Sequence, residues 1–487
     1  MNNLYQNLFK TVDASSLAVF RMGFGAILLF DCINYGIFLC LECDYHHTNM
    51  LFKYAGFEWI KPLPTLGLRA LWLLMGVCAA GIMLGWHYRV CMIAFTLGFI
   101  YQFLLDQAVY LNHFYMVILF CILMCFIPAN RYWALDARRN KAKPGTSGGY
   151  KVFENQPSLM PNWPRFLLAA QLEIILIYAG LVKINYDWLN LEPLRMWLTR
   201  RSADEGPILQ LLTQDWGIAV ASYGSILLHL VGAPLLLYRP ARLYVLAAYA
   251  AFHISNAFVF NIGIFPWFTL FGSLILFDPD WPKQLWNGMR WRFQAIRDRY
   301  PQPPLRIIGS SFSAPTTKVH HVIVIMIAGW LLLQVLIPVR HLVMPGDVAW
   351  NEAGHRYSWR MKLRSKQGKA RFAVSAQNES GNLRWIINPV DHLNQRQARK
   401  MPCIPDMVWQ FAQYLEQHYT ELGHKNVKVQ ADIVCSLNGR KYSRFINPQV
   451  DLTKISRYEP TTSWIVPLDK PLPNPVVSNL MLGLISK

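Results

Sequence analysis

Charge is scarce in this sequence, and negative charge is scarcer than positive charge. Only 15% of the 487 residues are charged, with 28 Asp and Glu against 47 Lys and Arg. Soluble domains typically have about 25% charged residues, so an ordinary soluble protein is excluded. The sequence also has no low-complexity tract and no internal repeat, which excludes a solenoid or an extended disordered chain.

Apolar residues take the place of the missing charge. They make up 53% of the chain, and aromatic residues make up 14%. Several apolar windows have about 18 to 22 residues, which at roughly 1.5 Å per residue can cross a hydrocarbon core of about 30 Å. The sequence therefore predicts a polytopic α-helical membrane domain with about nine spans. The predicted spans are residues 16–40, 67–86, 90–105, 110–128, 164–183, 217–238, 242–259, 262–277 and 320–338.

The loops between the predicted spans differ in charge. The loops at 129–163 and 278–319 are strongly basic, which places them in the cytoplasm by the positive-inside bias. The loops at 41–66 and 184–215 mix acids and bases, so they suit the outer face. An odd number of spans from a cytoplasmic N-terminus then places the chain after Val343 outside. Anionic lipid headgroups explain the net charge of +19, so we expect a bilayer and no nucleic acid as partner.

The last part of the chain has a different pattern. Three alternating runs predict strands and one longer segment predicts a helix, namely strands at 357–363, 370–376 and 427–433 and a helix at 394–422. We expect residues 1–340 to form the transmembrane domain and residues 341–487 to form an extracytoplasmic, β-rich α+β domain in the periplasm or the ER lumen. The PQPP stretch at 301–304 marks a linker. The nine cysteines are scattered, and the sequence assigns no disulfide.

Ionisable residues inside the predicted spans are candidates for function. Each costs on the order of 2.5 to 3.5 kcal/mol near the centre of a bilayer, so it needs a reason to be there. Arg21 and Asp31 are ten residues apart in the first span, nearly three helical turns, and cannot pair directly with each other. We expect them to have structural partners in neighbouring spans.

Three further ionisable residues fall at the outer ends of different spans. His113 follows Asn112 at the entrance of the fourth span, Lys183 ends the fifth, and His253 lies on one face of the seventh with Asn256 three residues later. Each could have a purely structural role, as a core histidine, a snorkelling lysine or a hydrogen bond between helices. Their shared location instead favours one pocket, where desolvation makes the neutral amine of a lysine available as a base. Such a pocket suits an apolar ligand such as a quinone, and we expect no metal site.

These residues carry a resemblance to a known family. The chain resembles the vitamin K-dependent γ-glutamyl carboxylase family, whose membrane part is shared with the broader HTTM-domain proteins. The resemblance covers nearly the whole chain, and several motifs in order make it specific. The matching stretches are Asn112-His113, ANRYWALD at 129–136, AGLVKINYDW at 179–188, FHISN at 252–256, NIGIFP at 261–266, RYSWRM at 356–361, INP at 387–389, INPQVDL at 446–452 and SWIVPL at 463–468.

The resemblance implies a reaction and a role for each candidate residue. It implies that Lys183 deprotonates reduced vitamin K, a naphthohydroquinone, which reacts with O2 to give a strongly basic alkoxide and then the epoxide. That base removes the γ-proton of a glutamate in a protein or peptide substrate, and the carbanion takes up CO2 to give γ-carboxyglutamate. His113 is expected to stabilise charge during carboxylation, whereas His253, Asn112 and Asn256 are expected at the cofactor.

Two departures from the family pattern qualify the expected function. Animal members have adjacent lysines, but Val182 precedes Lys183, so Lys183 is the only candidate base of that pair. The chain ends at Lys487, soon after the β-rich segment, which is expected of a compact, bacterial-type homologue without propeptide recognition. Two alternatives stay open, a quinol epoxidase without carboxylation and a non-catalytic HTTM membrane protein that binds lipid or acts as a scaffold.

Overall fold

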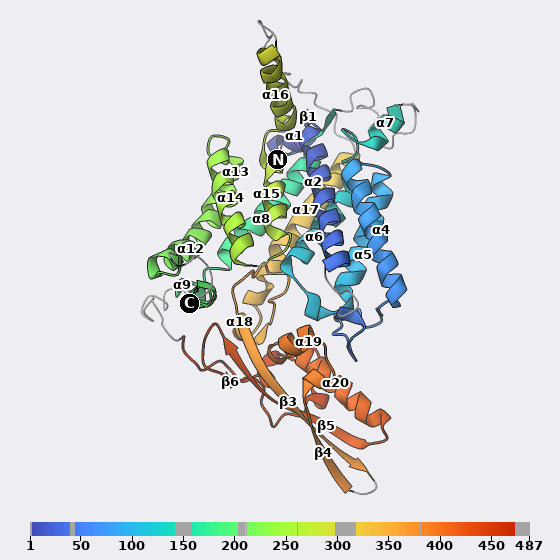
Figure 1. Ribbon diagram of the computed structural model, residues 1–487, viewed down its shortest axis with the longest axis vertical. Coiled ribbons are helices and arrows are strands. Elements are labelled where there is room, and N and C mark those ends of the chain that lie inside the picture. Colours follow the sequence, from blue (N-terminus) through green and yellow to red (C-terminus); the bar gives the residue numbers. More distant parts are fainter. Residues whose placement is uncertain are drawn as a thin grey trace.

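The computed structural model describes residues 2–38, 44–141, 158–202, 210, 212–260, 262–297, 318–378 and 381–472. Figure 1 shows a bundle of helices at one end of the molecule and a twisted antiparallel sheet with its own helices at the other. Two separate hydrophobic cores correspond to these two parts. The predicted linker at 301–304 lies outside the described residues.

Each predicted span coincides with a helical segment. Within the described residues, six segments are long and apolar enough to cross a membrane, while α6 and α15 with η5 are shorter apolar helices. The count of nine spans therefore stays a prediction. The segments are α2 (Ser15–Ile33) with η1 (Asn34–Phe38), α4 (Thr65–Leu84), α5 (Tyr88–Leu105), α6 (Asn112–Phe126), α8 (Trp163–Leu181), α12 (Asp215–Leu227) with η4 (Leu228–Gly232) and α13 (Ala233–Leu237), α14 (Arg242–Val259), α15 (Phe265–Ser273) with η5 (Leu274–Leu276), and α17 (Lys318–Val339) with η6 (Arg340–Leu342).

The loops separate into two groups at opposite ends of the bundle. Strand β1 (Thr11–Asp13) pairs with β2 (Leu159–Pro161), and Lys283 in α16 (Trp281–Arg297) forms an ion pair with Asp13 at 2.5 Å. Figure 1 shows α16 and α7 (Leu135–Lys141) at the end of the bundle away from the sheet. These loops are predicted to share one side of the membrane, and they lie at one end of the bundle; that this side is the cytoplasm stays a prediction.

Arg21 connects three segments near that end of the bundle. Its guanidinium is completely buried and donates to the carbonyls of Ile82, at 3.2 Å, and Trp133, at 2.6 Å. Gly85 allows this approach, because a Cβ there would lie 2.1 Å from the guanidinium and because its φ of +65° suits glycine. Arg21 thus has structural partners in neighbouring segments, as the sequence predicts.

The C-terminal domain, which we call the outer domain after its predicted location, is built on two long paired strands. The sheet has the order β4-β3-β5-β6, and β3 (Lys366–Asn378) pairs antiparallel with β5 (Lys425–Leu437) along most of its length. Strands β4 (Gly381–Ile387) and β6 (Ser443–Arg444) form its edges. One face packs on α20 (Pro405–Glu421), and Cys403 and Cys435 form a disulfide beside it. The predicted helix at 394–422 is divided into α19 (Gln395–Lys400), η8 (Met401–Cys403) and α20.

The predicted strand at 357–363 is wrong. This segment has no strand structure, and Tyr357, Trp359 and Lys362 all have positive φ values, between 53° and 62°. A left-handed residue at alternate positions curls the chain instead of extending it. Trp359 is completely buried within the core of the helical bundle, so the apolar alternation here reflects insertion between helix ends.

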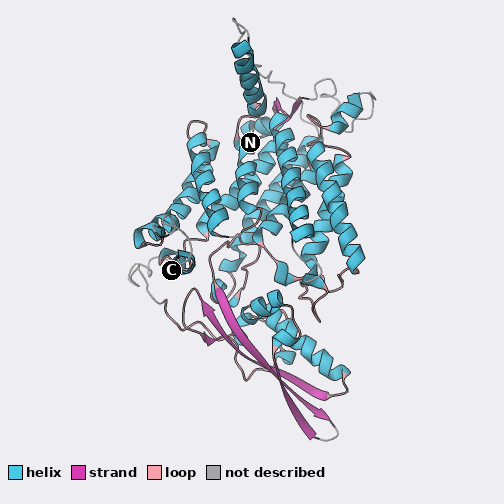
Figure 2. Cartoon of the chain, viewed as in Figure 1, coloured by secondary structure: helices cyan, strands magenta, loops and turns pink. Residues whose placement is uncertain are grey.

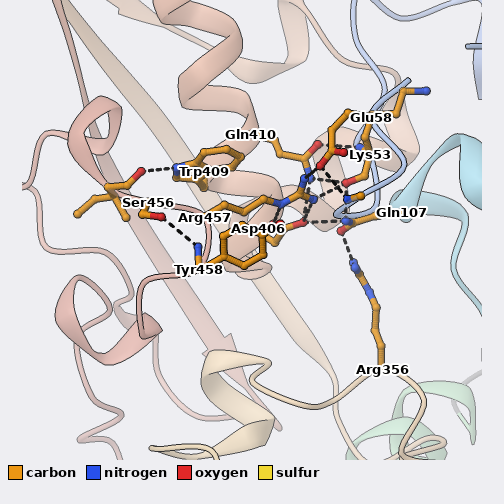
Figure 3. A network of polar contacts seen from close by, with 12 residues as sticks. Lys53, Glu58, Gln107, Arg356, Asp406, Trp409, Gln410, Ser456, Arg457 and Tyr458 are labelled. Carbon is orange, nitrogen blue, oxygen red and sulfur yellow. Dashed lines mark hydrogen bonds and ion pairs between the residues drawn. The ribbon is translucent and has the colours of Figure 1, made fainter. Parts of the chain in front are cut away.

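A network around Arg457 joins the outer domain to the loop before α4 (Figure 3). Arg457 donates to both carboxylate oxygens of Asp406, at 2.8 and 3.0 Å, to Glu58 at 2.7 Å and to the Lys53 carbonyl. The side-chain amide of Gln107 donates to the Lys53 carbonyl and to Asp406, both at 2.7 Å. We call these five residues the Arg457 network. It fixes one side of the outer domain to the helical bundle.

Candidate active site

Lys183 folds back onto the end of its own helix. Helix α8 ends at Leu181, the Lys183 N–H donates to the Gly180 carbonyl at 3.0 Å, and Nζ donates to the Ala179 carbonyl at 2.5 Å. The residue is only 6% exposed. A snorkelling lysine keeps its ammonium group in water, so this geometry does not fit a snorkelling role.

The residues after Lys183 form a compact turn that covers it. Asn185 caps α9 (Tyr186–Leu189) by accepting the Trp188 N–H at 3.1 Å, and its amide donates to the Val182 carbonyl at 2.9 Å. The Trp188 ring centroid lies 5.6 Å from Nζ of Lys183. Trp188 is held in turn by two hydrogen bonds with Ser222 of α12, at 3.1 and 3.2 Å. The local sequence therefore creates an enclosed environment for the lysine.

Asp187 connects the same turn to the outer domain. Its two carboxylate oxygens accept hydrogen bonds from the two terminal nitrogens of Arg440, both at 2.6 Å, and the amide of Asn438 donates at 2.7 Å. All three residues are buried. Asn438 and Arg440 belong to the turn after β5, so the sheet ends against the Lys183 segment.

Two histidines lie close to Lys183. His229 and His253 are almost completely buried and lie within electrostatic range of Lys183. His229 in η4 bonds the Ser225 carbonyl through Nδ1 at 2.6 Å, and His253 in α14 stacks on the Tyr249 ring at 5.8 Å. Both ring nitrogens of His253 lack a hydrogen-bond partner among the described residues. A buried imidazole without a partner is costly, and it is available to a polar group of a ligand.

A close helix contact brings His229 to the lysine. A Cβ at Gly180 in α8 would lie 2.9 Å from the His229 Cβ and 2.8 Å from a methyl group of Leu230. Glycine at 180 therefore lets α8 approach η4 more closely than any other residue permits. The π-helical turn of η4 directs His229 toward this contact.

His113 lies against a short turn, and Asn112 precedes it at the start of α6. His113 is half-buried, and a Cβ at Gly263, whose φ is +59°, would lie 3.5 Å from its Nε2. Phe265, two residues further on, contacts the His253 ring at 5.9 Å. Asn112 accepts a hydrogen bond from the Tyr110 hydroxyl at 3.1 Å. In the described part of the chain, no hydrogen bond joins His113 to Lys183 or His253.

The remaining candidate, Asn256, is one turn beyond His253 on α14. It is half-buried, and its backbone carbonyl accepts the Phe260 N–H at 2.8 Å. The structure thus brings Lys183 and His253 together, with Asn256 next along the same helix. His113 contacts the turn at 263–265, and Phe265 of that turn contacts His253.

Two buried ionisable residues of this region were missed by sequence analysis. One is His229, and the other is Glu173 in α8, which is 7% exposed and has no hydrogen-bond partner for either carboxylate oxygen among the described residues. Glu173 also interacts electrostatically with Tyr249, on which His253 stacks. Both missed residues lie inside predicted spans, so the criterion that selected Lys183 would have found them.

A separate small cavity lies near His113. Its volume is about 10 Å³, roughly the space of one water molecule, and it is lined by Tyr45 and by side chains of α4, α5 and α6 together with Val109. Its wall includes Phe114, the residue after His113, but among the described residues it includes neither Lys183 nor His253. This cavity is therefore too small for an aromatic cofactor.

Two family models match the chain, and together they cover most of its length. Residues 9–281 match the HTTM domain, and residues 319–471 match the lumenal domain of vitamin K-dependent gamma-carboxylase. No solved structure matches the chain. The buried lysine and histidines lie within the first match, and the sheet that bonds to Asp187 lies within the second. The chain therefore belongs to the HTTM-domain proteins of the vitamin K-dependent gamma-carboxylase family.

Proposed function

We propose that this protein is a vitamin K-dependent γ-carboxylase-like enzyme of the lyase class. It couples O2-dependent epoxidation of a reduced naphthoquinone to the carboxylation of protein glutamate with CO2, which gives γ-carboxyglutamate. The observation that carries this proposal is the buried Lys183 beside two imidazoles, in the segment bonded to the outer domain. We assign the transmembrane domain to residues 1–340 and the outer domain to 341–487.

Lys183 is the proposed base. Its enclosed position at Trp188 limits hydration, which favours the neutral amine over the ammonium ion. His229 and His253 add no negative charge that would hold the proton on Lys183. The neutral amine then takes a proton from a hydroxyl group of the reduced cofactor.

The residues around His253 fit a flat aromatic cofactor. Rings of Tyr249, Phe252 and Phe265 surround the imidazole at centroid distances of 5.1 to 5.9 Å, and both ring nitrogens are without partners among the described residues. A naphthohydroquinone has an apolar ring that can pack on these aromatic side chains and hydroxyl groups that can hydrogen-bond to the imidazole nitrogens. When bound, this cofactor together with O2 supplies the strong base that the family uses. His253, Asn256 and Asn112 orient the cofactor, and His113 stabilises charge during carboxylation.

The outer compartment determines the class of substrate. A disulfide such as Cys403–Cys435 persists in oxidising compartments, so the outer domain belongs in the periplasm or the ER lumen. The substrate is then a glutamate-containing segment of an exported protein. It reaches Lys183 from the side of Asp187, where the two domains meet.

A quinol epoxidase without carboxylation is the second candidate. It needs Lys183 and His253 but not His113, and no hydrogen bond among the described residues joins His113 to either of them. Asn112, which is proposed to orient the cofactor, lies beside His113, so this observation bears only on the carboxylation role of His113. The carboxylase remains our first proposal because the outer domain, which carries the carboxylase family match, is bonded directly to the lysine segment.

The test is a reaction with both products measured. The purified protein receives reduced vitamin K, O2, bicarbonate and a glutamate-containing peptide, and epoxide and γ-carboxyglutamate are quantified. Both products are expected. Epoxide alone supports the epoxidase. If neither product forms, both proposals are ruled out in favour of a non-catalytic membrane protein.

A pair of variants tests the role of Lys183. Lys183→Met retains the apolar chain and removes the amine, so epoxide formation is expected to stop. Lys61→Met, at an exposed lysine in the loop before α4, serves as the control and should retain full activity. Epoxide formation by Lys183→Met at the unaltered rate contradicts the proposed base.

A further inference from the structure

One face of the outer sheet is not covered by α20. In β3, Phe372 and Val374 face the helix, so the residues between them face away from it. The register extends this second face across the strands, because residues opposite each other in paired strands project to the same side. We call this surface, formed by the side chains directed away from α20, the outward sheet face.

The outward sheet face is strongly basic. Within the described strands it exposes five basic side chains and one acidic side chain. The basic residues are Lys369, Arg371, Arg384, Lys428 and Arg444, and the acidic residue is Asp432. This ratio of five to one exceeds the ratio of 47 to 28 for the whole chain. The excess positive charge is therefore a local property of the face.

Cross-strand pairing spreads this charge along the sheet. Arg384 of β4 and Lys428 of β5 are both opposite Ser375, at the far end of the sheet. Lys369 and Arg444 are both opposite Val434, nearer the helical bundle. The charges thus occupy both ends of the face and form an extended track.

Little of this charge is neutralised within the protein. Asp432 lies 3.8 Å from Arg444, and both side chains are more than half exposed, so the pair is weak. Lys369, Arg371, Arg384 and Lys428 form no ion pair with any residue that the structure describes. Their charges are available to a partner.

The basic track leads to the candidate active site. Strand β5 has 13 residues and extends roughly 40 Å at about 3.3 Å per residue. It ends at Leu437, and the next residues include Asn438 and Arg440, which bond to Asp187 beside Lys183. Figures 1 and 2 show that the sheet projects away from the helical bundle, so the distal charges of Arg384 and Lys428 lie far from a bilayer around the helices.

We propose that the outward sheet face is the docking surface for an extended acidic segment of the substrate protein. This inference rests on the proposed function, since it identifies how a chain containing several glutamates is held while one of them is presented near Lys183. Complementary charge raises the association rate and fixes the orientation of the bound segment. A segment with several carboxylates matches a track of several cations, whereas a single glutamate does not.

Binding of a labelled peptide tests the docking surface without any turnover. The full-length protein in detergent is titrated with a fluorescent peptide of about a dozen residues rich in glutamate, in the absence of quinol, and fluorescence anisotropy is followed. A peptide with every glutamate replaced by glutamine serves as the second probe. The acidic peptide is expected to bind at least tenfold more tightly than the neutral one at low salt, with the difference shrinking in high salt.

Charge reversal locates the surface. The double variant Arg371→Glu/Lys428→Glu is expected to weaken binding of the acidic peptide tenfold or more. The control, Arg399→Glu/Lys454→Glu, changes the same charge at exposed residues of α19 and η9 (Leu452–Lys454), outside the outward sheet face, and should bind like the unaltered protein. Equal binding by the two double variants overturns the proposal.

Two further measurements separate peptide docking from lipid binding and from turnover. If the acidic peptide binds in nanodiscs of neutral lipid but not in nanodiscs with anionic lipid, the face belongs to the membrane surface and the proposal fails. Because binding is measured without quinol, a protein that makes no γ-carboxyglutamate can still pass this test, so failure of the proposed function is recognised separately. In an active enzyme, the reversal should raise KM for the long acidic peptide and leave kcat on a short peptide unchanged.

Discussion

Asp187 and Arg440 form a buried, two-pronged ion pair between the segment that carries Lys183 and the turn after β5. Both hydrogen bonds measure 2.6 Å, and the two side chains are 12% and 7% exposed. The partners are separated by 253 positions in the sequence. The position of Lys183 is therefore determined by the outer domain as well as by α8.

Loss of Arg440 is expected to be strongly destabilising. Arg440→Met leaves the Asp187 carboxylate buried without its cation, which costs about 3 to 5 kcal/mol. Asp187→Asn/Arg440→Met removes both charges and should recover a large part of that loss. Denaturation of both variants in the same detergent measures the difference. A double variant that is less stable than Arg440→Met contradicts the pairing.

Gly180 is expected to tolerate no side chain. Gly180→Ala places a methyl group 2.9 Å from the His229 Cβ, so α8 and η4 must separate, at a cost of about 1 to 3 kcal/mol. Turnover should fall with stability, because His229 moves away from Lys183. Gly224→Ala in α12 is the control, since no atom lies within 4 Å of the added Cβ, and it should be neutral or slightly stabilising. Thermal unfolding and epoxide formation are measured for both, and equal behaviour of the two variants refutes the close contact.

Stability should depend on pH through Lys366 in the outer domain. Burial lowers the pKa of Lys366 from 10.5 to about 8, with a smaller opposing effect of Glu352. Between these two values the unfolded chain binds more protons than the folded one, so folding stability rises with pH through that window. The full contribution is on the order of 3 kcal/mol.

The comparison with Lys366→Met isolates this contribution. Melting is measured at pH 7.5 and pH 9.5 for the unaltered protein, for Lys366→Met and for the exposed control Lys369→Met. As the pH rises, the free energy of unfolding of the unaltered protein and of the control should increase relative to that of Lys366→Met. Parallel pH curves for all three proteins would show that the buried ammonium group is not destabilised by its surroundings.

The Cys403–Cys435 disulfide predicts a count of reactive thiols. In denaturant, reduction should expose two more thiols to a maleimide reagent in the unaltered protein than in Cys403→Ser/Cys435→Ser. The double variant should also lose about 2 to 4 kcal/mol of stability, because the disulfide restricts the unfolded chain. An identical gain of thiols on reduction in both proteins means that these cysteines are not paired.

The helices were predictable because their signal is continuous. Every predicted span coincides with a helical segment, since a long apolar window has few other stable conformations in a membrane protein. The strands at 370–376 and 427–433 were predictable for a similar reason, because one covered face imposes strict alternation. The strand predicted from the alternation at 357–363 was wrong because the backbone conformation at Tyr357 and Trp359 depends on packing between helix ends.

Sequence analysis did not identify every buried ionisable residue near Lys183. The outer ends of the spans indicated Lys183 and His253, whose roles stay predictions. His229 lies inside a predicted span and was overlooked as an ionisable residue, but its position beside α8 depends on the approach of η4 at Gly180, a contact between segments 49 positions apart. The bond between Asp187 and Arg440 is likewise a tertiary contact, so the sequence could not reveal how the outer domain is attached.

The outer domain contacts the helical bundle at several places, including the Asp187–Arg440 pair, the Arg457 network, and hydrogen bonds from Gln397 to Asp106 and from Lys400 to the Ala108 carbonyl. The Trp359 side chain is also buried in the core of the bundle. A rigid body held at three points that do not share a line cannot turn about any axis. The basic track therefore keeps a fixed direction relative to Lys183, and loss of a single attachment leaves the others to hold it.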